Sequence, residues 1–449
     1  MDLPEGVRRL WGLLDQRAPT YLVGGCLRDS LLGVAAKDFD LATALLPEQV
    51  MEAAAGLHVV PTGIRYGTVT VHTPTPVEVT TLRADGRYSD RRHPDQVAFT
   101  SRVEDDLARR DFTVNAMALG YDGSLADPFG GQRDLRARVI RAVGDPAERF
   151  LEDPLRIWRA VRFLSQLEDR TGRAWRLEAA TAGAITRYRA ETCEVSEERV
   201  RDELLKLLTC GSLAGLVAAV ESRLLFIAIP ELAALAGFQQ RHPHHDSDVL
   251  VHTLRVVGEV EATATLRLAA LLHDVAKPEC VLWLDGVTHF YGHDRLGAKM
   301  AEGILRRLRL PGEVVDRVVA LVAHHMFPWT EAGPKGYRRL LGEMGAEGLR
   351  ELVALHVADV RGSRAATARW ALPAEVAAMV EGVLAEPAEV MRLAVNGHDV
   401  MAAFGLGPGP EVGRLLAEAQ EWVWEDPARN EREAILEHLR PLLAEGGRP

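Results

Sequence analysis

The sequence has few cysteines, few aromatic residues and no uninterrupted apolar segment long enough to span a membrane. The four cysteines in 449 residues include no close pair, which argues against a disulfide framework and against a cysteine-based zinc ribbon. The most apolar long stretch, residues 212–237, is interrupted by charged residues and predicts packed helices of a soluble protein. Because the N-terminal residues lack the apolar core of a signal peptide, we expect a cytoplasmic protein with no membrane partner.

Positive charge is also in the minority. Lys and Arg total 53 against 64 Asp and Glu, which gives a formal net charge of −11. This balance argues against a protein coated in basic residues for nonspecific duplex binding, and no DNA partner is expected. The segment from Arg133 to Arg162 is an exception, with eight arginines against five acidic residues. A local basic surface there is compatible with an RNA backbone, and a solvated helix face explains it almost as well.

The length indicates several domains, since about 150 residues per domain gives roughly three. Residues from about 20 to 145 contain β-branched runs bounded by glycine and proline, with a helix-like stretch between residues 43 and 55. From residue 146 onward apolar residues recur at helical spacing, except for a hairpin expected over residues 281–291 with its turn at Asp285-Gly286. We therefore predict an α+β fold, mixed in its first third and helical afterwards.

A glycine pair, Gly24-Gly25, follows a short strand-like run and precedes a helix-like run. Glycines let backbone N–H groups approach an anion, and a helix N-terminus favours negative charge. Arg28 follows closely and could present its guanidinium to a polyphosphate. A glycine pair alone is more often an ordinary turn, so this feature needs further support.

That support comes from two carboxylates, Asp38 and Asp40, which follow at the spacing that places both on one side of a strand. Adjacent carboxylates repel unless a cation lies between them, and this is how Mg²⁺ is held against substrate phosphates. Glu78, between two valines, is a candidate third carboxylate from a neighbouring strand. A solvated strand edge explains each acid alone, but their combination with the glycine pair favours a metal site.

Two further groups of polar residues could contact a nucleotide. Arg110 could neutralise phosphate oxygens, and Asp111 and Asn115 are four residues apart, which places them on one face if the segment is helical. Asp153 and Arg156 offer one acceptor and one rigid donor fork, which could match the hydrogen-bonding edge of a base. The alternatives are an exposed helix start for the first group and an ordinary helix N-cap for the second.

Histidine and aspartate recur between residues 252 and 359 on helix-like segments. The set comprises His252, His273-Asp274, Lys277, His293, His324-His325 and Asp359. Burying a His-Asp pair in an apolar helix is costly unless something binds the pair. Imidazole and carboxylate groups from several helices suit a divalent metal ion. A lone histidine would more often be a core residue with satisfied hydrogen bonds, but the whole set favours a metal.

Seven segments, in this order and spacing, resemble the class II tRNA nucleotidyltransferase and bacterial poly(A) polymerase family. They are GGCLRD, KDFDLAT, VEVTTLR, DGRYSDRRHPDQVAFT, DDLARRDFTVNAMA, DPFGGQRDL and EDPLRIWRAVRF, and the resemblance covers about residues 20–235. It implies a polymerase-β-type nucleotidyltransferase head with a small mixed sheet, followed by an all-α body. The implied reaction is in-line attack of an RNA 3′-hydroxyl on the α-phosphate of a nucleotide, with release of pyrophosphate.

The same resemblance implies a role for each candidate residue of the head. Asp38 and Asp40 would bind the catalytic Mg²⁺, with Glu78 beside them as the third catalytic carboxylate. Asp153 and Arg156 would select CTP or ATP in place of a nucleic-acid template. The remaining contacts to the nucleotide would come from Gly24, Gly25, Arg28, Arg110, Asp111 and Asn115.

The histidine-rich set resembles the HD phosphohydrolase superfamily. By that resemblance the core ligands are His252, His273, Asp274 and Asp359. A second metal ion would be bound by His293 and His324, and Lys277 would contact phosphate. The implied metal is Mg²⁺, Mn²⁺, Ni²⁺ or iron, and the implied chemistry is attack of metal-activated water on a phosphomonoester or a 2′,3′-cyclic phosphate. A degenerate, purely structural HD bundle is the alternative.

Together these resemblances predict four parts of the chain. They are a nucleotidyltransferase head over residues 1–142, a helical neck that selects nucleotides and binds RNA over 143–237, an HD domain over 238–370, and a helical tRNA-binding tail over 371–449. The predicted function is addition of the terminal A, or of the whole CCA, to a tRNA 3′ end from ATP and CTP, with a phosphatase or phosphodiesterase activity in the HD domain. The alternatives are a poly(A) polymerase and a metal-dependent phosphohydrolase with an RNA-binding head.

One feature bears on the choice within the family. Members that add only CC are shortened in the loop before the Arg109-Arg110-Asp111 motif. That loop, at about residues 83–99, is full length here, which disfavours an enzyme that adds only CC.

Overall fold

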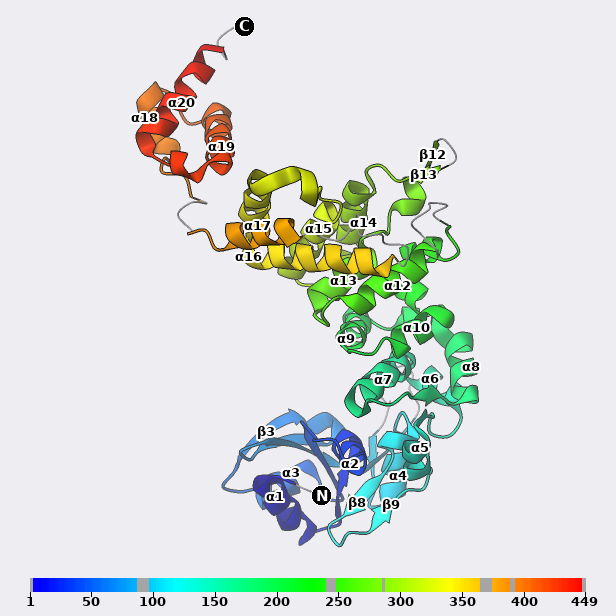
Figure 1. Cartoon of the computed structure of the whole chain (residues 1–449). Helices are drawn as coiled ribbons and strands as arrows, with labels where there is room; N and C mark the ends of the chain where they lie inside the picture. Colours follow the sequence, from blue (N-terminus) through cyan, green and yellow to red (C-terminus); the bar gives the residue numbers. More distant parts are fainter. Residues whose placement is uncertain are drawn as a thin grey trace. The chain divides into compact units, whose positions relative to one another are not determined.

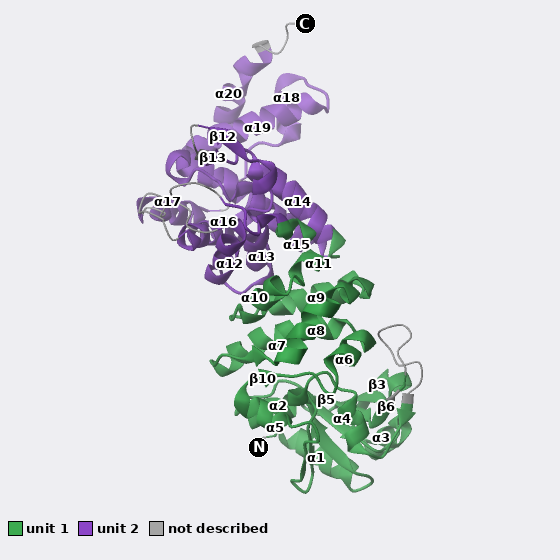
Figure 2. Cartoon of the chain, turned by 90° about the vertical axis from the view of Figure 1, so that its right-hand side faces the viewer, with its two compact units in different colours: residues 1–233, 307–309 green, residues 234–306, 310–449 purple. Residues whose placement is uncertain are grey.

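The computed structural model describes residues 3–86, 97–239, 248–284, 287–363, 374–387 and 392–445, and all structural statements refer to these residues. They form two compact units, shown in separate colours in Figure 2: residues 1–233 with 307–309, and residues 234–306 with 310–449. None of the described helices has the length and apolar character needed to cross a membrane. The finer division into four parts stays a prediction.

A seven-stranded mixed sheet forms the N-terminal part of the first unit (Figure 1). Strands β2 and β5 are parallel neighbours, whereas β1 is antiparallel to both β2 and β8. In spatial order the strands are β3 (His58–Gly63), β4 (Thr68–His72), β5 (Pro76–Thr81), β2 (Phe39–Thr43), β1 (Thr20–Val23), β8 (Ala118–Gly120) and β9 (Leu125–Ala126). This arrangement confirms the predicted α+β head.

One face of the sheet is covered by two helices, α1 (Glu5–Asp15) and α3 (Pro47–Ala53). Strand alternation decides which side chains join this core: Phe39 and Leu41 of β2 are buried in it, together with four valines of β4 and β5. Asp40, between Phe39 and Leu41, is therefore directed to the opposite face. The sequence pattern of β2 thus supplies a core on one side of the sheet and a carboxylate on the other.

Further short elements complete the first unit. They are α2 (Gly24–Leu31), η1 (Ile64–Tyr66), β6 (Arg83–Asp85) paired with β7 (Val97–Phe99), α4 (Val103–Ala108), η2 (Thr113–Asn115), α5 (Gly131–Ala137), and β10 (Val139–Ile140), which pairs in parallel with β11 (Arg176–Leu177). The helices that follow are α6 (Pro146–Glu152), α7 (Leu155–Thr171), α8 (Ala179–Tyr188), η3 (Arg189–Glu194), α9 (Glu197–Leu208), α10 (Ala214–Glu221), α11 (Leu225–Ala228) and η4 (Pro230–Leu235). Strand β11 was not predicted, because two residues are too short a run to recognise in a sequence.

The described residues of the second unit are helical apart from one hairpin (Figure 1). Its central helix is α13 (Ala264–Leu272), whose residues from Leu266 onward are all buried. The other elements are α12 (Val249–Glu259), η5 (Lys277–Glu279), β12 (Leu282–Leu284), β13 (Val287–His289), α14 (His293–Arg307), α15 (Gly312–His324), α16 (Trp329–Gly362), α17 (Ala374–Leu384), α18 (Gly397–Phe404), α19 (Pro410–Glu425), η7 (Pro427–Arg429) and α20 (Arg432–Glu445). The antiparallel pairing of β12 with β13 confirms the predicted hairpin, whose turn lies outside the described residues.

Candidate active sites

Three acidic residues of the head come together at the edge of strands β2 and β5. Asp38 immediately precedes β2, and Asp40 lies within it. Glu78 lies in β5, directly opposite Asp40 in the parallel register. Paired residues of neighbouring strands share one face of a sheet, so the Asp40 and Glu78 carboxylates point to the same side. Asp38 and Glu78 are exposed, whereas Asp40 is partly buried.

The electrostatics of Asp40 reflect this crowding. Burial raises the pKa of the Asp40 carboxyl to about 6; the neighbouring carboxylates Glu78 and Asp38 also raise it, and Arg110 acts in the opposite direction. Three neighbouring carboxylates, with one guanidinium nearby, supply the oxygen ligands that hard divalent cations bind. The residues present therefore fit a divalent metal site.

Helix α2 begins at the same place. Gly24, its first residue, has a φ of +72°, and a Cβ atom there would lie 3.0 Å from Asp40 Oδ2 and 3.4 Å from Arg110 Nη1. The absence of a side chain therefore keeps the helix start, the carboxylate and the guanidinium in close contact. Among the described residues no side chain caps the α2 N-terminus, so its first N–H groups, Gly25 included, are suited to an anion.

Arg28 occupies a different position from the one that its sequence neighbourhood indicates. The side chain is buried; it donates through Nε and Nη2 to Asp29 Oδ1, at 2.8 and 2.7 Å, and through Nη1 to Asn115 Oδ1 at 2.8 Å. In this arrangement Arg28 links α2 to the segment that contains Asn115. A direct contact with a polyphosphate would require the guanidinium to exchange these partners.

Asp111 and Asn115 meet without forming a regular α-helix. Residues 113–115 form the 3₁₀ turn η2, and Asn115 Nδ2 donates to Asp111 Oδ1 at 3.1 Å. The other carboxylate oxygen, Oδ2, accepts two hydrogen bonds from Arg159 of α7, at 2.9 and 2.6 Å. Burial alone would raise the pKa of Asp111, but Arg159 and Asn115 lower it to about 2, so this carboxylate stays ionised at neutral pH.

Asp153 and Arg156 lie at the junction of α6 and α7. The Arg156 backbone N–H donates to the Asp153 carbonyl at 3.0 Å, whereas the two side chains bind other groups. Asp153 accepts from the Leu155 backbone N–H at 3.1 Å and from Arg199 Nη2 at 2.9 Å. Arg156 donates to Glu152 Oε2 at 2.7 Å and to the carbonyl of Arg109 at 3.0 Å. The Asp153 side chain thus satisfies a backbone N–H at the start of α7, as the helix-cap interpretation expects.

Sequence reasoning missed several charged residues that hold these groups in place. Asp106 is buried and accepts hydrogen bonds from the guanidiniums of both Arg109 and Arg110. Burial would raise the pKa of Asp106, but the two arginines lower it below its usual value. The only sequence signal for Arg159 was its membership of the arginine-rich segment 133–162, and Arg199 had none.

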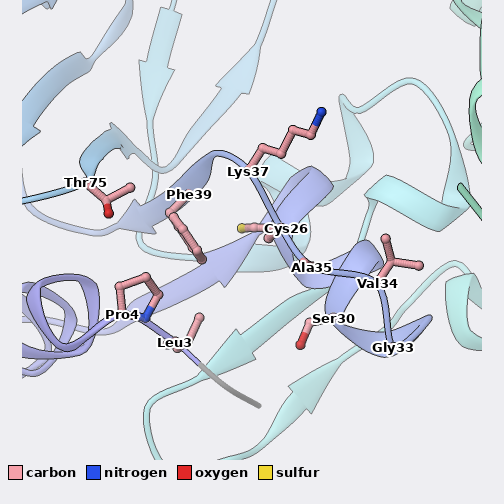
Figure 3. A pocket seen from close by; sticks show the side chains of 11 residues that line it. Leu3, Pro4, Cys26, Ser30, Gly33, Val34, Ala35, Lys37, Phe39 and Thr75 are labelled. Carbon is pink, nitrogen blue, oxygen red and sulfur yellow. The ribbon is translucent and has the colours of Figure 1, made fainter.

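A cavity of about 660 Å³ lies beside β2, and the three acidic residues do not line it (Figure 3). Its walls include Phe39, Cys26 and Ser30, and Figure 3 shows the Lys37 side chain extending away from Ser30. Burial raises the pKa of the Cys26 thiol to about 12, and its Sγ donates to the carbonyl of Val23 at 2.9 Å. Cys26 is therefore protonated at neutral pH and unsuited to act as a nucleophile.

The second unit brings its candidate ligands together from four helices and their ends. His252 lies in α12, His273 and Asp274 directly follow α13, His293 begins α14, and Asp359 lies in α16. Two triplets each have their ligand atoms within 4.8 Å of one another: His252, His273 and Asp274; and Asp274, His293 and His325. Asp274 belongs to both triplets, so its carboxylate could contribute a ligand to either.

His325, not His324, belongs to this cluster. His325 is 2% exposed, and its Nε2 lies 3.8 Å from Asp274 Oδ1. The side chain of His324 is 34% exposed, and its Nε2 lies 3.3 Å from Glu343 Oε2. The prediction that placed His324 in the group is therefore corrected. The reason is helical phase, because His325 follows the buried Val318, Leu321 and Val322 of α15 by seven, four and three residues.

Three of the histidine rings are oriented by backbone carbonyls. The Nδ1 atoms of His273, His293 and His325 lie 2.8, 2.6 and 2.7 Å from carbonyl oxygens three residues earlier. A carbonyl only accepts, so each Nδ1 carries the proton and each Nε2 of a neutral ring presents a lone pair. The Nε2 atoms of His293 and His325 are 3.1 Å apart, an arrangement that requires a proton or a cation between them.

Other features of the cluster agree with metal ligation. The Nε2 atom of His273 is buried and has no hydrogen-bond partner among the described residues. Asp359 Oδ1 lies 2.9 Å from His252 Nε2, and Lys277 Nζ lies 2.6 Å from Asp274 Oδ2. Burial would raise the pKa of Asp274, but His273 and Lys277 hold it well below its usual range. An ionised carboxylate surrounded by imidazole rings whose Nε2 atoms present lone pairs fits a divalent transition metal.

Comparison with known protein families identifies four matching regions. Residues 20–141 match the poly A polymerase head domain, and residues 176–235 match the probable RNA and SrmB-binding site of polymerase A. Residues 249–361 match the HD domain, and residues 388–439 match the putative tRNA nucleotidyltransferase domain 2.

Similar proteins agree with these matches. The A-adding tRNA nucleotidyltransferase of Deinococcus radiodurans is 36% identical over 89% of this chain and 91% of its own. The CCA-adding enzyme of Anoxybacillus flavithermus is 30% identical over 93% and 91%. The crystal structure of the Bacillus stearothermophilus CCA-adding enzyme in complex with CTP superimposes with a TM-score of 0.71, at 28% identity and with all of both chains covered.

Proposed function

Since the chain belongs to the family of tRNA nucleotidyltransferases that includes A-adding and CCA-adding enzymes, we propose that it adds AMP to the 3′ end of a tRNA without a nucleic-acid template. AMP addition is the step that A-adding and CCA-adding enzymes share. The observation that carries the proposal is the meeting of Asp38, Asp40 and Glu78 with the start of α2 at Gly24.

Each part of the site has a role in this reaction. The N–H groups of Gly24 and Gly25 and the Arg110 guanidinium bind the triphosphate of the nucleotide. The three carboxylates would hold Mg²⁺, which when bound would neutralise phosphate charge and favour ionisation of the RNA 3′-hydroxyl. The 3′-oxygen forms a bond to the α-phosphorus, the bond to the leaving pyrophosphate breaks, and the hydroxyl proton passes to solvent or to a neighbouring carboxylate.

The remaining residues position and select the nucleotide. Asp111, ionised and held by Arg159 and Asn115, accepts a hydrogen bond from the ribose hydroxyls. Asp153 and Arg156 match the edge of the incoming base after exchanging their present partners, Arg199 and Glu152 among them. Recognition of the base would therefore require the Asp153 and Arg156 side chains at the α6–α7 junction to leave two charged partners.

The second unit carries a second activity in this proposal. Its HD cluster binds a divalent metal ion, Mn²⁺, Mg²⁺, Ni²⁺ or iron, through His252, His273, Asp274 and Asp359, with His293 and His325 extending the set. Metal bound there would supply an activated water for phosphoester hydrolysis. Lys277 neutralises charge beside Asp274 and would contact the phosphate of a bound substrate.

Two broader proposals accompany these activities. The proposed head, neck, HD domain and tail occupy residues 1–142, 143–237, 238–370 and 371–449. The limit between neck and HD domain lies close to the boundary between the two compact units, at residues 233 and 234. The protein works in the cytoplasm, which is supported by four free cysteines, two of them buried in reduced form.

Incorporation of labelled ATP or CTP into three tRNA transcripts, ending before CCA, after C and after CC, tests the proposal. Asp40→Asn is the inactive control, since it removes one carboxylate charge without changing side-chain size. A single A on the CC-ended transcript alone makes this an A-adding enzyme, and CCA on the first transcript makes it a CCA-adding enzyme. Long A tails on any RNA would favour the poly(A) polymerase alternative, and no incorporation would overturn the proposal.

The expected exclusion of CC-only addition rests on the loop at residues 83–99. Its two ends are described and pair as β6 with β7, whereas residues 87–96 lie outside the described residues. The same transcripts test this expectation, because a CC-only enzyme would extend the first two and leave the CC-ended one unchanged.

A further inference from the structure

Four exposed arginines gather at one corner of the first unit. They are Arg136, Arg138, Arg173 and Arg176, called here the arginine corner. The N–H of Arg176 donates to the carbonyl of Arg138 at 3.1 Å, which fixes the two chain segments side by side through β10 and β11. Figure 2 shows β10 between α5 and α7. Arg136 lies in α5, Arg138 follows it, Arg173 lies shortly after α7, and Arg176 begins β11, the partner of β10.

The carboxylates next to the corner are already engaged by other groups. Asp134 is buried and accepts from Thr113 Oγ1 at 2.7 Å and from Arg141 Nε at 3.0 Å. Glu178 accepts from the Thr181 backbone and also lies 3.5 Å from Arg141. Within the described part of the chain, the four corner guanidiniums have no ion-pair partner. A chain of net charge −11 therefore presents a local concentration of positive charge here.

The backbone of Arg138 adopts a conformation that is unusual for arginine. Arg138 follows the last residue of α5 with φ 54° and ψ 53°, in the left-handed region where glycine is strongly favoured. An arginine at such a position is strained, and Arg223 and Arg309 share this backbone region among the described residues. Arg138 is also exposed, so packing does not account for it.

The corner is continuous with the segment that contacts the nucleotide. After Arg138 the chain passes through β10 to Arg141, whose carbonyl accepts from the Thr113 N–H at 2.9 Å, and Ala142 then pairs with Phe112. At about 3.3 Å per residue, Arg138 lies no more than roughly 13 Å along the strand from Ala142. This is the scale of a few nucleotides, so a chain whose 3′ end reaches Asp111 can bring earlier phosphates to the corner.

We infer that the arginine corner binds backbone phosphates of the RNA substrate upstream of its reacting 3′ end. The inference rests on the proposed function for the identity of the RNA. Guanidiniums pair with phosphate oxygens through a planar fork of donors, and such contacts set affinity and position without reading sequence. The corner therefore acts on RNA binding and not on the choice of nucleotide.

The test compares Arg138→Ala/Arg176→Ala with wild type and with Arg8→Ala/Arg9→Ala, a control that removes two exposed charges from α1. Affinity for a CC-ended tRNA is measured by fluorescence anisotropy between about 50 and 200 mM salt. We expect roughly tenfold weaker binding and a log–log salt dependence shallower by about 2 in the corner variant only, with KM for ATP unchanged. Equal salt slopes in the corner and control variants would overturn the inference.

Arg138→Gly separates phosphate binding from a structural role. Glycine relieves the strained backbone, so the variant should melt no lower than wild type while it loses affinity for the tRNA. Full affinity in this variant would contradict the inference. The proposed function is scored separately by AMP incorporation: if wild type binds the tRNA through the corner yet incorporates no AMP, the proposed function fails and the corner remains.

Discussion

The Asp40 carboxylate lies in β2 beside Glu78 and Asp38, and burial with these neighbours raises its pKa to about 6 from an ordinary value of 3.8. When an acid has a higher pKa in the folded than in the unfolded protein, its ionisation lowers the folding stability of the protein. For Asp40 this loss develops as pH rises from about 4 to about 6 and persists above that range. The same repulsion between carboxylates favours the binding of a divalent cation. The arrangement that destabilises the metal-free protein is therefore the one that the reaction needs.

Replacing Asp40 with asparagine should therefore stabilise the metal-free protein at neutral pH while abolishing AMP incorporation. The rise of the Asp40 pKa from 3.8 to about 6 corresponds to about 3 kcal/mol at most, and the partial exposure of Asp40 reduces the expected gain to about 1–2 kcal/mol. Urea unfolding in the presence of a chelator, at about pH 7 and about pH 4, measures this difference. The gain should disappear at the lower pH; an equal gain at both values would rule out the electrostatic explanation.

At the scale of the element, the start of α2 determines how closely phosphate can approach the carboxylates. Gly24→Ala places a methyl group 3.0 Å from Asp40 Oδ2 at a φ of +72°, where an alanine is strained. We expect a loss of about 1–2 kcal/mol in stability and a fall in kcat/KM for ATP of about tenfold or more, because the methyl group displaces a group that binds the triphosphate.

Gly183→Ala in α8 is the matched control for that variant. A Cβ there meets no atom within 4 Å among the described residues, so alanine should stabilise the helix by about 0.5–1 kcal/mol and leave kinetics unchanged. Thermal unfolding and steady-state kinetics are measured on both variants. Wild-type kinetics in Gly24→Ala would show that the close approach at α2 has no part in catalysis.

Elements also mark the limit of what sequence could predict. The hairpin β12–β13 was predictable because a turn dipeptide separates two β-branched and aromatic runs, and Asp40 and Glu78 were recognisable within short strands. The choice between His324 and His325 required the phase of α15 against the core. The partners of Arg28 and Asp153 could not be predicted from the sequence, because Asn115 and Arg199 are 87 and 46 residues away in sequence from the residues they bind.

At the scale of the whole molecule, the two candidate metal-binding sets lie in separate compact units. The carboxylates and the α2 start belong to the first unit, and the histidine cluster belongs to the second. No residue is shared between the two sets, and each is assembled by elements of its own unit. The two activities should therefore be separable by substitution, even where both act on one RNA.

His325→Ala provides the strictest test of this separation, because His324→Ala is a control at the adjacent position. His325 is buried, 3.1 Å from His293 and 3.8 Å from Asp274, whereas His324 lies near Glu343. His325→Ala should reduce bound metal, measured by mass spectrometry, and lower hydrolysis of a 2′,3′-cyclic nucleotide by at least about tenfold, the effect of losing one ligand-sphere group. AMP incorporation should stay at the wild-type rate.

The control and the reciprocal variant complete the argument. His324→Ala should retain its bound metal, its AMP incorporation and its hydrolysis of the cyclic nucleotide. Asp40→Asn should lose AMP incorporation while it continues to hydrolyse the cyclic nucleotide. Loss of metal from His324→Ala alone would reverse the assignment made from the phase of α15. Loss of AMP incorporation from a folded His325→Ala protein would show that the histidine cluster acts on the nucleotidyltransferase site across the unit boundary, because no ligand of that site has been changed.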